Sequence, residues 1–167
     1  IEPVKILKDK GYQFQLLLAG EGPDEEKLTQ AIQAEKLTDY IKLLGIRKDI
    51  PTLCNQAHCL VMSSLWEGLP IVLLEAGASH LPVISTNVGS VSSLIDEKTG
   101  YLIAHTDELT GKMQEVLDNY PIATEKGMAL YQRIQQGFSI EKVVLQHEDL
   151  YKELILKTAD FPIATYQ

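Results

Sequence analysis

The sequence predicts an α/β fold in which a Rossmann-like, doubly wound parallel sheet is flanked by helices. Short apolar runs alternate with amphipathic helical segments along most of the 167 residues. Strands separated by helices in this rhythm pair in parallel through right-handed crossovers. The length suits one domain with a sizeable core. We therefore expect one domain over residues 1–157 and a C-terminal tail over residues 158–167.

The first half of the chain supplies three strands and three helices. Residues 14–19 read as a strand, followed by a helix over residues 23–35 that Pro23 opens. A strand at residues 41–44 precedes a short helix at residues 49–56, which has Pro51 near its start. The apolar run at residues 59–63 is the third strand. Pro70 suits the first helical position, where the missing N–H costs nothing, and the run over residues 71–79 supplies the third helix.

The second half adds strands at residues 83–85 and 100–103, with a short helix at residues 91–94 between them. Three helices close the chain, over residues 107–119, 122–136 and 139–156. In the last helix apolar residues recur at helical spacing from Ile140 to Leu154, and Ser139 stands where an N-cap is needed. We therefore expect this helix to pack on the sheet, with His147 in a structural role.

The composition narrows the class of protein. The net charge of −8, from 15 basic and 23 acidic residues, argues against nucleic acid as a partner. No apolar stretch reaches the roughly 18 to 20 residues of a membrane span, and no signal peptide opens the sequence. We expect a cytoplasmic protein, with attachment to the inner membrane face through other parts. Cys54 and Cys59 flank His58, which leaves a zinc site as an alternative to the buried reduced thiols that we expect.

Residues 67–75 carry the strongest functional signal, because they place two carboxylates around the start of a helix. No Ser, Thr, Asp or Asn stands directly before Pro70, so the first backbone amides have no side-chain cap and stay available to an anion. The helix dipole favours the same occupant. Gly68 has no Cβ and allows close approach of a ligand. The amides in question belong to Gly68, Leu69, Ile71 and Val72, beside Pro70.

The two carboxylates differ in their surroundings. Glu67 lies in the loop at the mouth of the site. Glu75 stands inside an apolar helix, where a carboxylate is costly to desolvate unless it is hydrogen-bonded. A ribose diol would satisfy it, as in dinucleotide sites. The alternatives are an ion pair with Arg or Lys of the same domain, or exposure to water. The sequence leaves all three open.

The nine residues from Glu67 to Glu75 resemble the Glu, seven residues, Glu signature of retaining glycosyltransferases with the GT-B architecture, of family four (glycosyl transferases group 1). Other segments resemble this family in the same order: residues 16–23 its strand ending in Gly-x-Gly-Pro, residues 41–45 its next strand and glycine, residues 82–89 the strand after the signature, and residues 99–103 a later strand. The resemblance covers roughly residues 13–157. Ser90 and Val91 depart from it, since the family commonly has a second Gly and an acidic pair there.

The resemblance implies a nucleotide-sugar donor, UDP- or GDP-linked, and transfer of a hexose-type sugar with retention and without a metal or other cofactor. The acceptor would be a growing glycan or a lipid-linked acceptor. Glu67 would be catalytic, binding donor-sugar hydroxyls and orienting C1, and Glu75 would anchor the ribose. The donor would also contact loops that end strands, through Gly20, Gly22, Gly45, Ile46 and Arg47. Backbone atoms of Ile46 and Arg47 would hold the base, and the Arg47 side chain could stack on it or lie in a solvated turn.

The resemblance also implies parts that would precede Ile1, namely an N-terminal acceptor domain and an opening strand with an Arg and a Lys for the pyrophosphate. The chain by itself is therefore expected to be inactive, and its tail would cross toward that domain. Two readings compete with a glycosyltransferase: a nucleotide-sugar epimerase of GT-B architecture, and a non-enzymatic doubly wound interaction module. Glycoside hydrolysis is less favoured, because its two carboxylates must face one bond, whereas Glu67 is in a loop and Glu75 in a helix.

Overall fold

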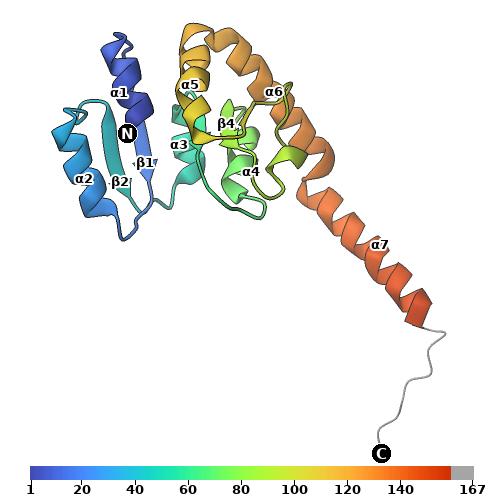
Figure 1. Cartoon of the computed structure of the whole chain (residues 1–167). Coiled ribbons are helices and arrows are strands. Elements are labelled where there is room, and N and C mark those ends of the chain that lie inside the picture. The colour runs from blue at the N-terminus through green and yellow to red at the C-terminus, as the bar shows by residue number, and fades with distance from the viewer. Residues whose placement is uncertain (159–167) are drawn as a thin grey trace, which may run out of the picture.

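A computed structural model describes residues 1–158 and consists of five strands and flanking helices (Figure 1). The tail expected at residues 158–167 lies almost wholly outside this range. The strands are β1 (Leu16–Ala19), β2 (Ile41–Gly45), β3 (Leu60–Met62), β4 (Val83–Thr86) and β5 (Tyr101–Ile103). The α-helices are α1 (Glu2–Asp9), α2 (Glu25–Ala34), α3 (Ile50–Gln56), α4 (Ile71–Ala78), α5 (Leu109–Asp118), α6 (Tyr120–Gly137) and α7 (Ile140–Thr158). Short 3₁₀ turns occupy Val91–Ser93 and Thr106–Glu108.

The strands pair in parallel throughout, which confirms the predicted α/β class. They form two sheets, one with the order β1-β2 and one with the order β3-β4-β5. Leu16 pairs with Ile41 in the first sheet, and Leu60 pairs with Val83 in the second. β1 and β3 are not paired with each other, so each has one edge that is hydrogen-bonded to no other strand of residues 1–158.

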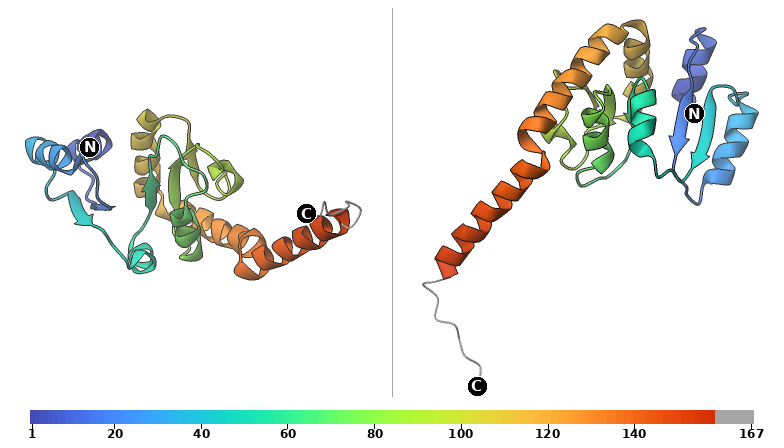
Figure 2. Two further views of the ribbon diagram at one scale, coloured as in Figure 1. Left: turned by 90° about the horizontal axis from the view of Figure 1, so that it is seen from below. Right: turned by 180° about the vertical axis from the view of Figure 1, so that it is seen from behind.

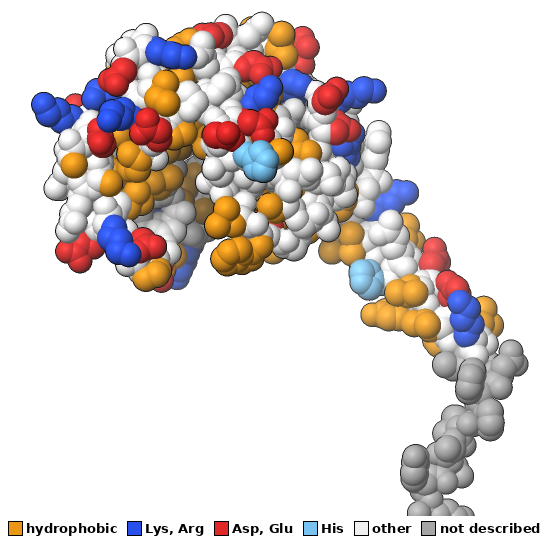
Figure 3. Space-filling view, in the orientation of Figure 1, with side chains coloured by type: hydrophobic (Ala, Val, Ile, Leu, Met, Phe, Trp, Pro, Cys, Tyr) orange, Lys and Arg blue, Asp and Glu red, His pale blue; other side chains and the backbone are white. Residues whose placement is uncertain are grey.

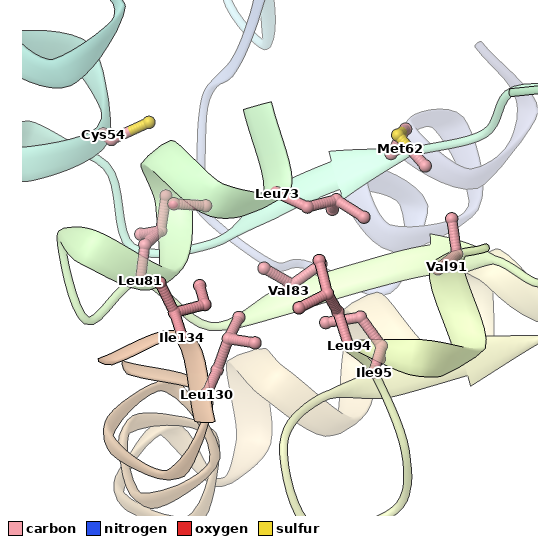
Figure 4. Packing of buried hydrophobic residues seen from close by; sticks show 11 residues of the cluster. Cys54, Met62, Leu73, Leu81, Val83, Val91, Leu94, Ile95, Leu130 and Ile134 are labelled. Carbon is pink, nitrogen blue, oxygen red and sulfur yellow. The ribbon is translucent and has the colours of Figure 1, made fainter. Parts of the chain in front are cut away.

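Most of the core lies around the second sheet (Figure 4). Leu73 of α4, Val83 of β4 and Leu130 of α6 are fully buried and belong to one cluster. This cluster fixes α4 between the sheet and α6. Since α4 carries the candidate site at its first residues, the core of the domain sets the position of that site.

The helix α1 was not predicted from the sequence. Its Leu7 packs with Ile84 and Ile103 of the second sheet, whereas its Val4 packs with Ile32 and Ile41 of the first. The signal for a helix was present in the apolar spacing of Val4 and Leu7 and in a proline within the first turn. This short helix joins the cores of the two sheets.

Two close contacts fix α6 against the rest of the domain. A Cβ built on Gly127 would lie 2.3 Å from the carbonyl oxygen of His80, so only glycine lets the helix approach this turn. Arg133 binds the carboxylate of Asp96 at 2.6 Å and donates to the Leu94 carbonyl at 3.0 Å. The hydrogen bond from Arg133 lowers the pKa of Asp96 to about 2. These contacts hold α6 over α4 and over the turn that leads into β5.

The predicted packing of the last helix on the sheet is wrong. Figures 1 and 2 show α7 running away from the body of the domain. Ile140 is 70% exposed and Tyr151 is 58% exposed. The helix α6 takes this place instead, since its Leu130 and Ile134 pack in the core cluster with Leu73 of α4 and Val83 of β4. The predicted cap is confirmed, since Ser139 Oγ accepts the Lys142 amide at 3.3 Å.

The ends of the predicted strands and helices differ from the observed ends by at most two residues. No helix within residues 1–158 combines the length and apolar composition that crossing a membrane requires.

Candidate functional site

The helix α4 begins at Ile71 without a side-chain cap, as the sequence predicted. Pro70 is the N-cap itself, one position before the first helical residue, with φ −66° and ψ 122°. Its carbonyl accepts the Leu73 amide at 3.1 Å. The backbone amides of Gly68, Leu69, Ile71 and Val72 donate to no acceptor within residues 1–158. The helix start thus presents free donors and the positive end of its dipole to one exposed loop.

Hydrogen bonds within the domain fix the Glu67 side chain and its loop. Ser64 Oγ donates to Glu67 Oε1 at 2.8 Å. The Ser64 carbonyl in turn accepts Thr86 Oγ1 of β4 at 2.7 Å, and the Thr86 side chain is buried. The Glu67 carboxylate is therefore oriented by a chain of contacts that starts inside the sheet. Sequence reasoning did not identify Ser64, although a hydroxyl three residues before the signature Glu was a usable signal.

The loop after β4 packs against the backbone of the Glu67 loop. The Ser90 amide donates to the Gly68 carbonyl at 2.8 Å. Gly89 adopts φ +55°, and a Cβ built there would lie 2.0 Å from the Glu67 carbonyl oxygen and 2.5 Å from that of Gly68. Only glycine allows this approach. Gly89 and Ser90 therefore pack directly against the backbone of Glu67 and Gly68.

Glu75 is half-buried on α4 and forms no ion pair within residues 1–158. This removes one of the three alternatives that the sequence left open. Burial and the nearby Glu75 carboxylate raise the pKa of the Cys54 thiol, which places Glu75 on the side of α4 that meets α3. Its carboxylate remains available for an outside donor.

The remaining candidate residues lie where β1 and β2 end. Gly20 (φ +136°) and Gly45 (φ +62°) both adopt a backbone that favours glycine, and the Gly20 amide donates to the Gly45 carbonyl at 2.8 Å. A Cβ on either residue, or on Gly22, would meet nothing within 4 Å, so this surface is open. Ile46 is 63% exposed.

Arg47 is paired with the carboxylate of Asp49, two residues further along the chain. Its Nε and Nη2 donate to the two carboxylate oxygens of Asp49 at 2.8 and 2.6 Å. These hydrogen bonds raise the pKa of Arg47 and lower the pKa of Asp49. The guanidinium is therefore held toward the start of α3, and stacking on a base would require it to leave Asp49.

The candidate loops gather at one end of the molecule, as expected for ligand sites at the carboxyl ends of parallel strands. Figure 1 shows the β1–α2, β2–α3 and β3–α4 connections along the same lower edge. A groove of about 870 Å³ separates β1 from β3. Figure 3 shows this hollow, with hydrophobic side chains along it. One group of candidate residues lies on the β1–β2 side of the groove, and the other lies on the α4 side.

The cysteines line the wall of this groove rather than the loops: Cys54 is buried and Cys59 is half-buried. Cys54 is part of the core cluster, and burial raises the pKa of the Cys59 thiol to about 12. Across residues 1–158, no group of three or more His, Cys, Asp or Glu side chains lies close enough to hold a metal ion. His147 is also remote from the loops, and its Nδ1 lies 2.8 Å from the Val143 carbonyl on α7.

A parallel α/β fold with an uncapped helix start and glycine-rich loops at one edge suits the class of doubly wound domains that bind phosphate-containing ligands. The family within this class is shown by sequence, because the profile of the family "Glycosyl transferases group 1" matches residues 1–135. The chain belongs to that family. Sequence comparison and structure comparison therefore agree with the fold class derived from the residues.

Named relatives extend this result. A UDP-Gal:alpha-D-GlcNAc-diphosphoundecaprenol alpha-1,3-galactosyltransferase of Escherichia coli is 30% identical over 144 residues, which cover 84% of this chain and 37% of the enzyme. The structure of HepE of Anabaena in complex with UDP and glucose superimposes with a TM-score of 0.81 at 19% identity, over 91% of this chain and 44% of HepE. The C-terminal domain of LpcC, a glycosyl transferase group 1 family protein of Francisella tularensis, gives a TM-score of 0.75 at 23% identity, over 83% of this chain and 77% of that domain. The chain spans 24–38% of the length of several curated relatives.

Proposed function

We propose that this chain is the C-terminal, donor-binding domain of a retaining GT-B glycosyltransferase, which acts in polysaccharide or glycoconjugate biosynthesis. The observation that carries the proposal is the unbonded run of amides from Gly68 to Val72 beside the oriented Glu67 carboxylate. Such an arrangement suits a diphosphate that is joined to a sugar: the amides meet the charged part and the carboxylate meets the hydroxyls.

The chemistry follows from where charge develops. As the sugar leaves the donor, negative charge grows on the departing nucleoside diphosphate while the sugar becomes oxocarbenium-like. Fixed amides at Gly68, Leu69, Ile71 and Val72 would stabilise that charge without reorganisation, and removing one donor from comparable sites costs roughly 3 kcal/mol. Glu67 would bind sugar hydroxyls and orient C1 toward the acceptor.

The nucleoside would extend from the diphosphate along the loops. Glu75 would accept the ribose hydroxyls, and its lack of an ion pair within the described chain supports this role. Gly20, Gly22 and Gly45 would let the donor approach the backbone closely, and the backbone of Ile46 and Arg47 would hold the base. We propose a UDP- or GDP-linked hexose as donor and a glycan or lipid-linked acceptor bound by the other half of the enzyme.

The rest of the proposal concerns the whole protein. The chain alone would be inactive, because the acceptor would be bound by the other half of the enzyme. We propose a cytoplasmic enzyme, peripheral at the inner membrane face where a lipid-linked acceptor would be found.

Calorimetric titration of the 167-residue chain with UDP and with GDP tests donor binding. We expect one nucleotide to bind, and Glu75→Ala to weaken its affinity at least tenfold while the unfolding midpoint stays unchanged. Glu125→Ala is the matched control, because Glu125 is exposed on α6, far from the loops. Unchanged affinity of Glu75→Ala would reject the ribose role. A folded chain that binds neither nucleotide would favour an interaction module.

Turnover of the full-length enzyme tests Glu67. Glu67→Ala should lower kcat at least a hundredfold with little change in the KM for the donor, because the side chain acts on the sugar during transfer rather than on the nucleotide. Ser64→Ala should give a smaller loss, since it removes only the 2.8 Å hydrogen bond that orients the carboxylate. A Glu67→Ala enzyme with normal kcat would remove Glu67 from the site.

A further inference from the structure

A side-chain hydroxyl continues the contact between β3 and β4 beyond the last pair of their backbone ladder. Met62 and Ser85 form that last pair. Two residues after Met62, the Ser64 carbonyl accepts the hydroxyl of Thr86 at 2.7 Å. The Thr86 side chain therefore attaches the first residues of the loop to the sheet, at a place where the two backbones are no longer paired.

Thr86 is itself held firmly at the end of β4. The residue is only 4% exposed. Its carbonyl accepts Ser85 Oγ at 3.0 Å and the Val88 amide at 3.1 Å. The next amide, that of Asn87, donates to the Ile103 carbonyl of β5 at 2.8 Å. A β-branched side chain is also stiff at χ1, so the Thr86 hydroxyl is a fixed donor.

The loop that Thr86 holds carries the Glu67 carboxylate. Ser64 Oγ has one proton and donates it to Glu67 Oε1 at 2.8 Å. Across residues 1–158 this is the one polar contact of the Glu67 side chain, which is otherwise exposed. An exposed glutamate without such a contact exchanges among several staggered rotamers. The choice of one rotamer thus depends on where the Ser64 backbone is held.

We propose that Thr86 is a positioning residue for Glu67 and acts through Ser64. The buried hydroxyl fixes the Ser64 backbone, the Ser64 hydroxyl takes Oε1, and Oε2 is left to a sugar hydroxyl. The proposal rests on the proposed function for the catalytic role of Glu67, whereas the ordering of the side chain is a property of the chain without ligand.

NMR of the 167-residue chain without nucleotide tests this ordering, through the three-bond couplings that report χ1 of Glu67. Thr86→Val removes the hydroxyl and keeps the branched shape, and Thr86→Ser keeps the hydroxyl. Thr99→Val is the matched control. Thr99 is 2% exposed, and its hydroxyl likewise donates to a backbone carbonyl, that of Leu94 at 2.9 Å.

We expect the couplings of a single rotamer in the original chain and averaged couplings in Thr86→Val and Ser64→Ala. Thr86→Ser and Thr99→Val should keep the original values. Wild-type couplings in folded Thr86→Val would overturn the proposal, as would averaging in Thr99→Val, which would show a general loosening. Ser64 is only half-buried, so Ser64→Ala is the second variant if Thr86→Val does not fold, and unchanged couplings there would overturn the proposal as well.

Turnover of the full-length enzyme separates this proposal from the catalytic role of Glu67. Thr86→Val should lower kcat on the order of tenfold with little change in the KM for the donor, and Thr86→Ser should restore it. In a Ser64→Ala background Thr86→Val should have little further effect on kcat, because both changes break one chain of contacts. Full additivity would overturn the action through Ser64. Averaged couplings in Thr86→Val, together with a normal kcat in Glu67→Ala, would support the positioning and reject the catalytic role.

Discussion

Replacing Gly89 by alanine tests whether the loop after β4 supports the Glu67 segment. The new Cβ would lie 2.0 Å from the Glu67 carbonyl oxygen, and the residue would have to keep φ +55°. A left-handed backbone costs a residue with a Cβ about 1–2 kcal/mol. The clash would also part the two loops and break the Ser90–Gly68 hydrogen bond, worth about 1 kcal/mol. We expect a total loss of about 2–3 kcal/mol in the free energy of unfolding.

Urea unfolding followed by circular dichroism measures this loss. Gly45→Ala is the matched control, because Gly45 has a similar φ of +62° and a Cβ there would meet nothing within 4 Å. The control should lose only the backbone cost of about 1–2 kcal/mol. For a chain of this size the Gly89→Ala loss corresponds to a decrease in Tm of about 5–10 °C. If the two variants lose the same free energy, the Glu67 loop does not depend on contact with Gly89.

Three further predictions concern the body of the domain. Gly127→Ala should destabilise it by about 2 kcal/mol, because the added methyl meets a backbone carbonyl. Gly111→Ala is the control: its methyl would lie in open space on α5, and the change should stabilise the domain by about 0.5–1 kcal/mol in the same urea assay. A loss of stability in both variants would contradict the argument. Arg133→Met should cost about 1 kcal/mol at pH 7, a figure kept small because both partners are partly exposed. The depressed pKa of Asp96 means that this difference is present above about pH 4 and is lost as the pH falls through about 2, and a difference that is the same at both ends of the range would refute the link. Cys59 should resist iodoacetamide at pH 8 in the native chain and react in urea, as mass spectrometry can follow, because burial raises its pKa to about 12; modification of the native chain would show that the thiol is accessible.

The sequence predicts most strands and helices because their apolar periodicity reports burial directly. β4, with four buried residues, follows from such a local signal, whereas α2 begins at Glu25, after the proline that the sequence placed at its start. The helix α1 was missed because it offers only two turns, with Val4 and Leu7 as its buried residues. The apolar spacing in α7 was read correctly as helical, but its burial was not. Periodicity tells which face is apolar and does not tell whether a partner covers it.

The candidate site shows the same division. A missing cap is a local property, so the free amides near Pro70 could be predicted from the residues on either side of it. The contact of Ser64 with Glu67 and the approach of Gly89 to the same backbone depend on how loops from two strands meet. The Arg47 ion pair with Asp49 spans only two residues, yet its geometry depends on the turn that begins α3.

The projecting helix α7 has a consequence for calorimetry. Its side chains meet water over most of its length, and ion pairs such as Lys152 with Glu148, one turn apart, contribute about 0.3–0.5 kcal/mol each. The helix α7 therefore melts as a helix–coil transition of its own, broad and at low temperature, while the sheets unfold together later. The heat absorbed in a scan will exceed the van't Hoff enthalpy of the main peak, and removing residues 140–167 will bring the two values together.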